Sequence, residues 1–463
     1  MVFDDLFEID KNKKLLKCKF NNSTTPIYLI IRAYLFRKII QNKFELETNI
    51  PPSKLPRASI FKYIFIALFK NIFFAPKKSI YIFSDEVLFI KKGNRYEHRL
   101  LDFLNEFYSK DAQLITNSGN RIFKTPKKQN VFNLDLINDL SIIFGFFTRL
   151  KRKDKITIDL FMDLLRSDKN VLLTEKQYEE LHLVLVKIAK RKGFLKGAYN
   201  LFFKLKSPKL LILNAAHYLG EKAFILEHAK ANGVITAEQQ HGYIGKSHYA
   251  YNFDESLNPI LKKVLPDFFL SFGSYWNKQI RTPAKKVVIG NSNIIENVNQ
   301  LILSKINQDK LNILIISCAT NTKGIMSLCR ALLTSELALM YNFTIRPHPS
   351  EKHNFEVRYK SILEEGVILD NNENLYQTLK DVSIVVSLDF STVLYESVFF
   401  TKKIFLQKTD YSNFYESDPI FISFNDNQDL LRLIMEEQEI EIEPNEIWDT
   451  NSHSNFNSFL TQI

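Results

Sequence analysis

Short apolar runs recur along most of the chain, and segments of helix length separate them. A short continuous apolar run between polar residues is typical of a strand buried on both faces, whereas longer amphipathic segments are typical of helices. Strands that alternate with helices in this way predict parallel sheets covered on both sides, which is an α/β fold. The predicted strands cover residues 79–83, 209–214, 234–236, 267–272, 286–289, 312–317, 343–346, 367–369, 383–387 and 403–406.

The rhythm of strands and helices restarts near residue 290, so we expect two Rossmann-like domains whose parallel sheets face a cleft. Periodic segments at 25–43 and 59–74 predict helices before the first strand. Further helices are predicted near 100–110 and at 221–232, the latter ending at Gly233. The expected boundaries are 1–75 for an N-terminal helical arm, 76–288 for the first domain, 289–430 for the second domain and 431–463 for an acidic tail or return helix.

Composition narrows the class of protein. Among 463 residues, 45% are hydrophobic and 24% are charged, which excludes a mainly disordered chain. The net charge of +11 suggests an anionic partner. The other explanation for this charge is an AT-rich genome, which also favours the abundant Lys, Asn, Ile and Phe.

Cysteine usage and the apolar stretches predict a cytoplasmic protein. Cys18, Cys318 and Cys329 form no CxxC pair, which fits a reducing compartment and argues against a structural zinc site. The N-terminus has no apolar core of a secretory signal, and the longest apolar stretch, 63–74, is too short to span a bilayer. No P-loop, GxGxxG, GxSxG or HExxH motif occurs and no DxD motif stands out, so ATP hydrolysis, dehydrogenation, α/β-hydrolase and zinc chemistry lose support.

The first polar cluster follows the predicted strand at 234–236 and reads Glu-Gln-Gln-His-Gly-Tyr-Ile-Gly-Lys. Ligands of doubly wound sheets bind beyond the carboxyl ends of the strands, and glycine lets backbone N–H groups come close to a phosphate or sugar. Gln240, His241 and Gly242 are therefore candidate site residues, with His241 a catalytic candidate. The alternative is a tight turn whose imidazole is satisfied within the turn.

The second cluster is Arg-Pro-His-Pro-Ser, which follows the strand at 343–346. Its two prolines hold the chain extended, so a stiff loop presents the imidazole of His348. A fixed histidine can donate a hydrogen bond or a proton as negative charge develops on a leaving phosphate. His348 is therefore a catalytic candidate, and the alternative is a turn in which it caps a neighbour.

The third cluster follows the strand at 383–387, where Ser391 and Thr392 stand at the start of a predicted helix. Hydroxyl groups and backbone N–H groups at a helix N-terminus favour an anion. Glu396 lies about one turn later on the same side as Thr392, where a carboxylate can accept hydrogen bonds from ribose hydroxyls. An ordinary N-cap would account for the hydroxyls but not for Glu396.

The fourth cluster, Ser-Asp-Glu, follows the strand at 79–83. A carboxylate on the first domain that faces the second is what deprotonation of an acceptor hydroxyl requires. Asp85 and Glu86 are therefore candidate bases. The alternative is an ordinary acidic loop.

Taken in order, the segments QQHGYIGKSHY, PDFFLSFGSYW, KVVIGN, RPHPS and SLDFSTVLYES resemble bacterial GT-B glycosyltransferases of capsule and lipopolysaccharide assembly. The resemblance extends over roughly residues 205–410. It implies that the second domain binds a nucleotide-sugar donor and that the first domain binds the acceptor.

The resemblance also assigns roles to single residues. In related bacterial sialyltransferases and Kdo transferases, a His-Pro pair and a Ser/Thr pair hold the donor phosphate, which implies that role for His348 and for Ser391 with Thr392. Glu396 resembles the acid that binds the donor ribose, and Gly242 with His241 resembles a loop that faces the cleft. The remaining donor-binding candidates of this set are Arg346, Gln240 and Gly273, the last resembling a hinge-side loop glycine.

The resemblance favours a CMP-linked acid sugar as donor, with UDP-sugars open, and no metal or other cofactor. Teichoic-acid glycerophosphotransferases share the same His-Pro logic, so a CDP-polyol phosphotransferase is an alternative. A nucleotide-sugar epimerase, a non-catalytic scaffold that binds other capsule-assembly proteins and a nucleic-acid binder are further alternatives, although RNP1 and GXXG signatures are not evident.

Three segments mix Lys and Arg with aromatic and aliphatic residues, at 59–74, 149–153 and 187–209. Such segments can lie in the headgroup region of an anionic leaflet, so we expect a growing surface polysaccharide or lipid-linked glycan as acceptor and peripheral contact with the inner membrane. The alternative is core helices with solvated basic faces.

Overall fold

The structure is a computed structural model. It describes residues 3–44, 57–85, 89–92, 95–98, 108–118, 124, 131–302, 311–317, 321–348, 351, 354–410, 412, 420–436 and 438–463. Glu86, Cys318 and most of the helix predicted at 100–110 lie outside these residues.

The first sheet has seven strands, all paired in parallel, in the order β5-β4-β1-β6-β7-β8-β9. Counted along the chain, its strands run 3-2-1-4-5-6-7, which is the Rossmann order with one strand added. The strands are β1 (Ile80–Asp85), β4 (Ala112–Asn117), β5 (Phe132–Asn133), β6 (Leu210–Asn214), β7 (Ile235–Gln239), β8 (Phe268–Ser271) and β9 (Lys285–Val288).

The second sheet has six parallel strands in the order β12-β11-β10-β13-β14-β15, which is 3-2-1-4-5-6 along the chain. The strands are β10 (Leu311–Ile316), β11 (Tyr341–Arg346), β12 (Ile368–Leu369), β13 (Ile384–Ser387), β14 (Lys403–Gln407) and β15 (Ile422–Phe424). The predicted fold class, two Rossmann-like α/β domains, is therefore confirmed.

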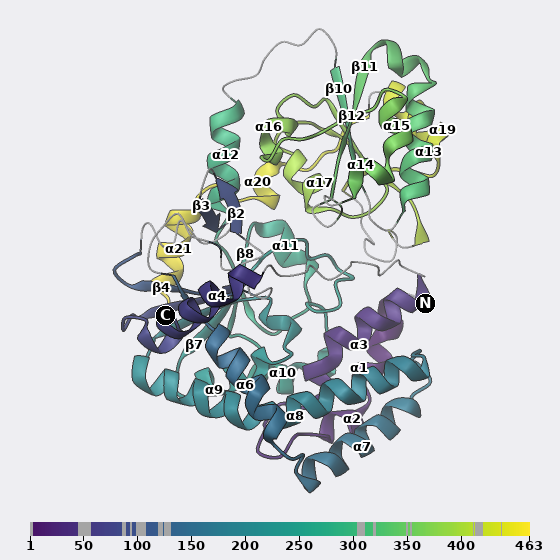
Figure 1. Ribbon diagram of the computed structural model, residues 1–463. Coiled ribbons are helices and arrows are strands. Elements are labelled where there is room, and N and C mark those ends of the chain that lie inside the picture. Colours follow the sequence, from purple (N-terminus) through teal and green to yellow (C-terminus); the bar gives the residue numbers. More distant parts are fainter. Residues whose placement is uncertain are drawn as a thin grey trace.

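Helices cover both faces of each sheet, and Figure 1 shows the second domain above the first. Around the first sheet lie α1 (Phe7–Asp10), α2 (Lys13–Lys17), α3 (Ile27–Lys43), α4 (Arg57–Phe69), α6 (Asp135–Phe147), α7 (Arg152–Arg166), α8 (Glu175–Lys206), α9 (Lys222–Ala231), α10 (Asn258–Val264) and α11 (Ser274–Gln279). With the second sheet are α12 (Ser292–Ile302), α13 (Thr322–Leu333), α14 (Phe355–Arg358), α15 (Lys360–Glu364), α16 (Leu375–Leu379), α17 (Thr392–Ser397) and α19 (Asn427–Met435), followed by α20 (Pro444–Ile447) and α21 (Ser452–Leu460).

Side chains of β1 alternate between two hydrophobic clusters, as the pleat of a strand requires. Tyr81 and Phe83 join the cluster beneath α6 to α9, whereas Ile80 and Ile82 join the cluster on the opposite face. This second cluster continues into one face of the second sheet, where it includes Ile316 of β10. One apolar core therefore runs from the first domain into the second.

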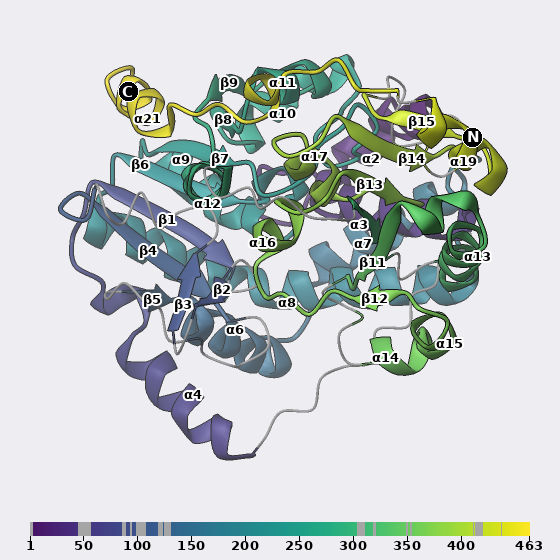
Figure 2. The same cartoon turned by 90° about the horizontal axis from the view of Figure 1, so that it is seen from above.

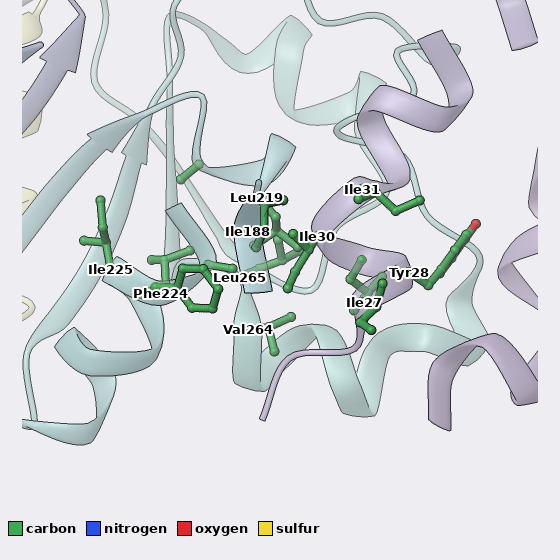
Figure 3. Close-up of a cluster of buried hydrophobic side chains, with 14 of the residues drawn as sticks. Ile27, Tyr28, Ile30, Ile31, Ile188, Leu219, Phe224, Ile225, Val264 and Leu265 are labelled. Atoms are coloured by element: carbon green, nitrogen blue, oxygen red, sulfur yellow. The ribbon is translucent and has the colours of Figure 1, made fainter. Parts of the chain in front are cut away.

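The N-terminal segment that we expected as a helical arm is helical, and α3 is built into the core of the first domain. Its buried residues, among them Ile27, Tyr28 and Ile30, belong to the same cluster as Phe83 of β1. Figure 3 shows these side chains against Ile188 of α8, Leu219, two residues of α9 and the end of α10. The continuous burial of α3 explains why its sequence shows little amphipathic contrast.

The tail crosses the junction of the domains. Trp448 donates a hydrogen bond from Nε1 to the carbonyl of Tyr395 in the second domain (2.7 Å) and packs against Phe272 of the first (5.1 Å between ring centroids). Beyond it, α21 packs on the first domain, with Phe459 against Phe268 of β8. Helix α21 is seen at the edge of the first domain in Figure 2.

All ten predicted strands are present, with shifts of a few residues at their ends. The prediction missed β4, β5 and β15 and the antiparallel hairpin of β2 (Phe89–Lys92) and β3 (Arg95–His98). In β4 the reason is visible, because Gln113 and Thr116 are buried polar residues that interrupt the apolar run.

A buried ion pair joins α1 and α3 to a loop of the first domain. Asp10 and Arg32 are 0% and 2% exposed, and their contacts measure 2.6 Å from Nε to Oδ1 and 2.7 Å from Nη2 to Oδ2. Arg32 also donates to the carbonyls of Tyr249 and Asn252, the latter at 2.9 Å from Nη2. Tyr28 donates to Asp10 as well (2.6 Å).

We expect the Arg32→Met variant to lose about 3–5 kcal/mol of unfolding free energy, because it leaves the carboxylate of Asp10 buried without its counter-charge. Urea unfolding followed by circular dichroism measures this loss. The matched control is Arg330→Met, which removes an arginine from an exposed pair with Glu365. Equal midpoints for the two variants would contradict the importance given to Arg32.

Candidate functional site

Both sheets have a topological switch point, where the strand order reverses and ligands of open α/β sheets bind. In the first sheet it lies between β1 and β6, and in the second between β10 and β13. Asp85 is the last residue of β1, while Ser387 is the last residue of β13. Two of the four predicted clusters therefore follow strands that border a switch point.

A pocket of about 460 Å³ opens at the switch point of the first sheet. Its wall includes Asp85, Asp135, Arg191, Glu221 and Lys222, so it presents charges of both signs beside apolar surface. Asp85 accepts a hydrogen bond from Asn117 (3.3 Å), and one of its oxygens lies 3.6 Å from Nζ of Lys222.

Asp135 is the buried acid of this pocket. Its Oδ1 accepts a hydrogen bond from the backbone of Ser118 (3.0 Å), while Oδ2 has no hydrogen-bond partner among the described residues. Burial raises the pKa of Asp135 to about 6, although the bond from Ser118 acts in the opposite direction. A polar pocket with an unsatisfied oxygen in its wall suits a ligand that carries hydroxyl groups.

His241 follows β7 and lies in a network of buried polar groups. Tyr251 donates its hydroxyl hydrogen to Oε1 of Glu238 (2.6 Å), and the same hydroxyl lies 3.2 Å from Nδ1 of His241. The other oxygen of Glu238 contacts Nδ1 of His217, whose Nε2 lies 2.9 Å from the hydroxyl of Thr282. The carboxylate is 0% exposed and every contact to it comes from a polar group.

This network determines the tautomer of His241. Because Tyr251 gives its only hydroxyl hydrogen to Glu238, the hydroxyl accepts from Nδ1–H of His241, and Nε2 is the unprotonated nitrogen. Burial lowers the pKa of His241, against the opposing charge of Glu238, so the ring is neutral at pH 7. Asp85 and Lys222 also lie close enough to affect this titration. A neutral imidazole with an unprotonated Nε2 can accept a proton.

Gln240 stabilises its own loop. Its Oε1 accepts a hydrogen bond from the backbone of Phe272 and its Nε2 donates to the carbonyl of Gly242, both at 2.9 Å. The side chain is 0% exposed. Both ends of the amide are used within the protein, and the predicted contact between Gln240 and a donor stays a prediction.

Gly273 also has a structural role. A Cβ atom at this position would lie 2.3 Å from the carbonyl oxygen of Glu446, so only glycine lets α20 pack here. The close approach of the tail explains why glycine stands at this position, and the donor-binding role of Gly273 stays a prediction.

Hydrogen bonds with Ser317 and Glu351 hold the loop after β11 in place. The backbone N–H of His348 donates to the hydroxyl of Ser317 (2.7 Å), which in turn donates to the buried carboxylate of Glu351. Glu351 is 2% exposed and also accepts from Arg358 (3.1 Å) and Tyr359 (3.3 Å). Partial burial lowers the pKa of His348, against the charge of Glu351. The loop thus presents a neutral imidazole from a rigid backbone.

Arg346 does not extend toward this histidine loop. Its Nη1 contacts Oδ2 of Asp370 and lies 3.2 Å from the hydroxyl of Thr378. Both partners belong to the neighbouring β12–α16 region, so the guanidinium ties two segments of the second domain together. The predicted direct role of Arg346 in donor binding stays a prediction.

The loop after β13 ends at α17. Ser391 caps the helix, because its hydroxyl accepts from the backbone of Val393 (3.3 Å). Thr392 follows, partly exposed. Glu396 is 1% exposed and accepts a hydrogen bond from the hydroxyl of Tyr376 (2.6 Å), so its carboxylate lies beneath the surface rather than on it.

The loops after β7 and β13 meet at the junction of the two domains. A Cβ atom on Gly242 would lie 3.8 Å from Cγ2 of Thr392. The ring of Tyr243 stacks on Phe390 with centroids 5.4 Å apart and an angle of 23°, and it also lies against Tyr395 (5.5 Å). The structure therefore brings two of the four predicted clusters into direct contact.

The other candidates lie around this contact. His348 follows β11, which is two strands from β13 in the same sheet, so about 10 Å separates the two loop starts. Asp85 lies on the first domain near His241, as its effect on that ring shows. Glu86 lies outside the described residues.

Sequence reasoning missed Tyr251, His217 and the charge of Glu238. The signal for Glu238 was present, since a carboxylate inside an apolar strand needs a buried partner. The partner itself was not recognisable, because it depends on how residues 248–251 fold back over β7.

Among the described residues, no three His, Cys, Asp or Glu side chains gather in a group that could hold a metal ion. In the same part of the chain, no helix combines the length and apolar character that crossing a bilayer requires.

No protein-family model and no curated protein matches this sequence. Among solved structures, the UDP-GlcNAc 2-epimerase of Neisseria meningitidis bound to UDP-GlcNAc is similar over 83% of this chain and 100% of its own, with 12% identity and a TM-score of 0.48. The UDP-GlcNAc 2-epimerase of Methanocaldococcus jannaschii is similar over 83% of this chain and 99% of its own, with 11% identity and a TM-score of 0.47. The lipopolysaccharide outer core galactosyltransferase WaaB is similar over 83% of this chain and 100% of its own, with 13% identity and a TM-score of 0.44.

We expect acid to destabilise the protein through His98, which is 0% exposed with Nε2 2.7 Å from the hydroxyl of Ser84. Burial lowers its pKa from 6.5 to about 3. Between these values the unfolded chain binds a proton that the folded chain does not, so stability falls as the pH decreases below 6.5, by about 1.4 kcal/mol per unit.

Urea unfolding between pH 7 and pH 5 measures this slope. In the His98→Gln variant, whose amide does not titrate, the slope should be smaller by about one proton. An unchanged slope would show that His98 is protonated in the folded state. Asp135 acts in the opposite direction, since its raised pKa adds stability that is lost as the pH rises toward 6.

We expect long-range ¹H–¹⁵N spectra of histidine-labelled protein to show His241 as the Nδ1–H tautomer at pH 7. The Tyr251→Phe variant removes the hydroxyl acceptor and should give a mixture of tautomers. Tyr249→Phe is the matched control, because no contact between its hydroxyl and His241 is described. An Nε2–H tautomer in the wild-type protein would contradict the proposed network.

Proposed function

We propose that this protein is a GT-B glycosyltransferase that moves a sugar from a nucleotide-activated donor to a growing surface polysaccharide or lipid-linked glycan. The stacking of Tyr243 on Phe390, with Gly242 close to Thr392 beside it, carries the proposal. It joins polar loops at the carboxyl ends of both sheets, where the two substrates of a transfer reaction can meet.

The second domain would bind the donor. The hydroxyl groups of Ser391 and Thr392 and the imidazole of His348 would stabilise the phosphate as its bond to the sugar breaks, a role that a metal ion has elsewhere. His348, as a neutral imidazole, would donate a hydrogen bond from a loop that Ser317 and Glu351 hold in place. Glu396 would accept hydrogen bonds from the donor ribose with the same carboxylate that accepts one from Tyr376.

The first domain would bind the acceptor in the pocket at its switch point. A base would take the proton of the acceptor hydroxyl while the oxygen forms its bond to the sugar carbon and the bond to phosphate breaks. His241 has the tautomer for this role, and Asp85 lies beside it as the second candidate. The remaining polar groups of the pocket would orient the acceptor.

We further propose a CMP-linked acid sugar as the preferred donor, on the resemblance of the His-Pro and Ser/Thr motifs to sialyltransferases and Kdo transferases. Cytoplasmic transfer at the inner membrane, within capsule or lipopolysaccharide assembly, rests on the same resemblance. The basic and aromatic segments favour a membrane-anchored acceptor, although the segment at 187–209 is mainly the core helix α8, with Tyr199, Phe202 and Phe203 buried.

The first experiment is a thermal-shift screen of the protein against CMP, CDP, UDP, GDP and TDP without added metal. A nucleotide at 100 times its dissociation constant stabilises a protein by about 2.7 kcal/mol. Selective stabilisation by CMP is expected. Stabilisation by CDP would instead indicate a polyol-phosphate donor, and stabilisation by UDP, GDP or TDP would indicate another sugar donor. No response to any nucleotide would contradict nucleotide-dependent transfer.

We expect the His348→Ala variant to lose about 10²–10⁴-fold in turnover with the donor that the screen identifies, while its melting temperature stays near that of the wild type. His182→Ala is the matched control, because His182 is an exposed histidine of α8 in the other domain. Near wild-type turnover in His348→Ala would exclude the proposed role of its imidazole.

A further inference from the structure

Exposed phenylalanines cover two neighbouring helices of the first domain. Phe61, Phe65 and Phe69 of α4 are 83%, 63% and 59% exposed, and Phe146 and Phe147 of α6 are 81% and 77% exposed. We call these residues the phenylalanine face. Contiguous exposed apolar surface is rare on soluble proteins and marks an interaction site.

The face is not a consequence of poor packing of α4. Tyr63 and Ala67 are the buried residues on one side of this helix, and Tyr63 donates a hydrogen bond to Asp139 of α6 (2.7 Å). The three phenylalanines of α4 follow one another at intervals of four residues, which aligns them along another side of the helix. Figure 2 shows α4 projecting from the edge of the first domain, close to α6.

Basic residues predominate around the face, beside one acid, Asp139 of α6, which accepts the hydrogen bond from Tyr63. Residues 57–70 and 140–153 contain seven Lys and Arg and no Asp or Glu. Lys62 and Lys70 of this set are exposed beside the phenylalanines of α4. The others that are exposed follow α6 directly and are Arg149, Lys151, Arg152 and Lys153.

We propose that the phenylalanine face docks on the surface of an anionic lipid bilayer. Aromatic rings would enter the boundary between headgroups and acyl chains, and the surrounding Lys and Arg would contact lipid phosphates. With 13 residues, α4 is about 20 Å long, which is too short to span the bilayer and suits a helix that lies in its plane.

Charge favours a bilayer over a second copy of this chain. A two-fold contact would bring the same basic patch of each copy together, and like charges across an interface oppose association. An anionic leaflet supplies the opposite charge over the whole patch.

The docking surface is continuous with the pocket of the first domain. Tyr63 of α4 and Asp139 and Ile142 of α6 line that pocket, and Ile142 is itself 49% exposed. A docked protein would therefore hold the pocket beside the headgroups. On the proposed function, this orientation would let an acceptor enter while its lipid anchor stays in the membrane.

Co-sedimentation with lipid vesicles tests the docking without any nucleotide or acceptor. The protein is mixed with vesicles of phosphatidylcholine alone and with vesicles that also contain phosphatidylglycerol. We expect binding to the anionic vesicles, weaker binding at high salt, and little binding to the neutral vesicles. Equal binding to both would contradict the role of the basic residues.

The decisive variant replaces Phe61, Phe65, Phe146 and Phe147 by serine. We expect its affinity for anionic vesicles to fall about tenfold or more while its melting temperature is kept, because the four rings are exposed. The matched control is Leu339→Ser with Val357→Ser, two residues of the second domain that are 80% and 83% exposed. Equal losses in both variants, or none in the first, would overturn the proposal.

A fluorescent variant distinguishes insertion from adsorption by charge alone. Trp276 and Trp448 are 1% and 2% exposed and give a constant background, so Phe61→Trp reports the face itself. We expect its emission to shift to the blue on anionic vesicles, with quenching by brominated acyl chains. No shift despite binding would overturn docking by the phenylalanine face.

Sedimentation velocity checks the second-copy explanation. If the protein binds no vesicles but self-associates, and the serine variant abolishes this association, the face is an interface between copies and the bilayer proposal is wrong. Nucleotide stabilisation in the serine variant should equal that of the wild type, so failure of the docking and failure of the proposed transfer activity give different results.

Discussion

The arrangement of the candidate site depends on the buried ion pair of Asp10 and Arg32. Arg32 donates hydrogen bonds to the carbonyls of Tyr249 and Asn252. Tyr251 lies between these two residues in the sequence, and its hydroxyl joins Glu238 to His241. Helices at the start of the chain thus fix a loop about 220 residues later. Burying such a pair is costly unless every charge is matched, and here each guanidinium nitrogen has a partner. The N-terminal helices are therefore part of the site's scaffold.

The junction of the two domains is also held by contacts between distant parts of the chain, here by close packing rather than by an ion pair. The tail passes over Gly273 and Gly290, and at Gly290 a Cβ would lie 2.3 Å from the carbonyl of Asp449. Gly290 has a φ of +77°, a conformation that glycine adopts without strain. Trp448 then connects both domains through Phe272 and Tyr395. The stacked rings of Tyr243 and Phe390 pack against the same apolar cluster, so the loops after β7 and β13 share one cluster with the tail.

The sequence predicted what depends on local pattern. Continuous apolar runs are recognisable as strands from sequence alone. A polar cluster that follows such a strand lies at the carboxyl edge of a parallel sheet. The structure has Asp85, His241, His348 and Ser391 at these edges. Contacts across the fold are different. Gln240 has the residue type and position of a ligand group, yet its amide is used by Phe272 and Gly242. Only the tertiary structure distinguishes a side chain that faces a ligand from one that closes its own loop.

The basic and aromatic segments show most clearly that the sequence pattern alone does not determine which side chains are buried. Residues 59–74 and 187–209 have similar compositions, and from sequence both could lie on a membrane or in a core. In α8 the rings of Tyr199, Phe202 and Phe203 are buried, and Phe202 packs against Tyr81 and Phe83 of β1. In α4 the phenylalanines are exposed, and among residues 61–69 only Tyr63 and Ala67 are buried. Hydrophobic content alone cannot separate the two, because burial depends on whether a neighbouring element supplies a surface. For α8 the sheet supplies it. For α4 no element of the described residues covers the phenylalanines, and the anionic bilayer that we propose would supply a surface of matching charge.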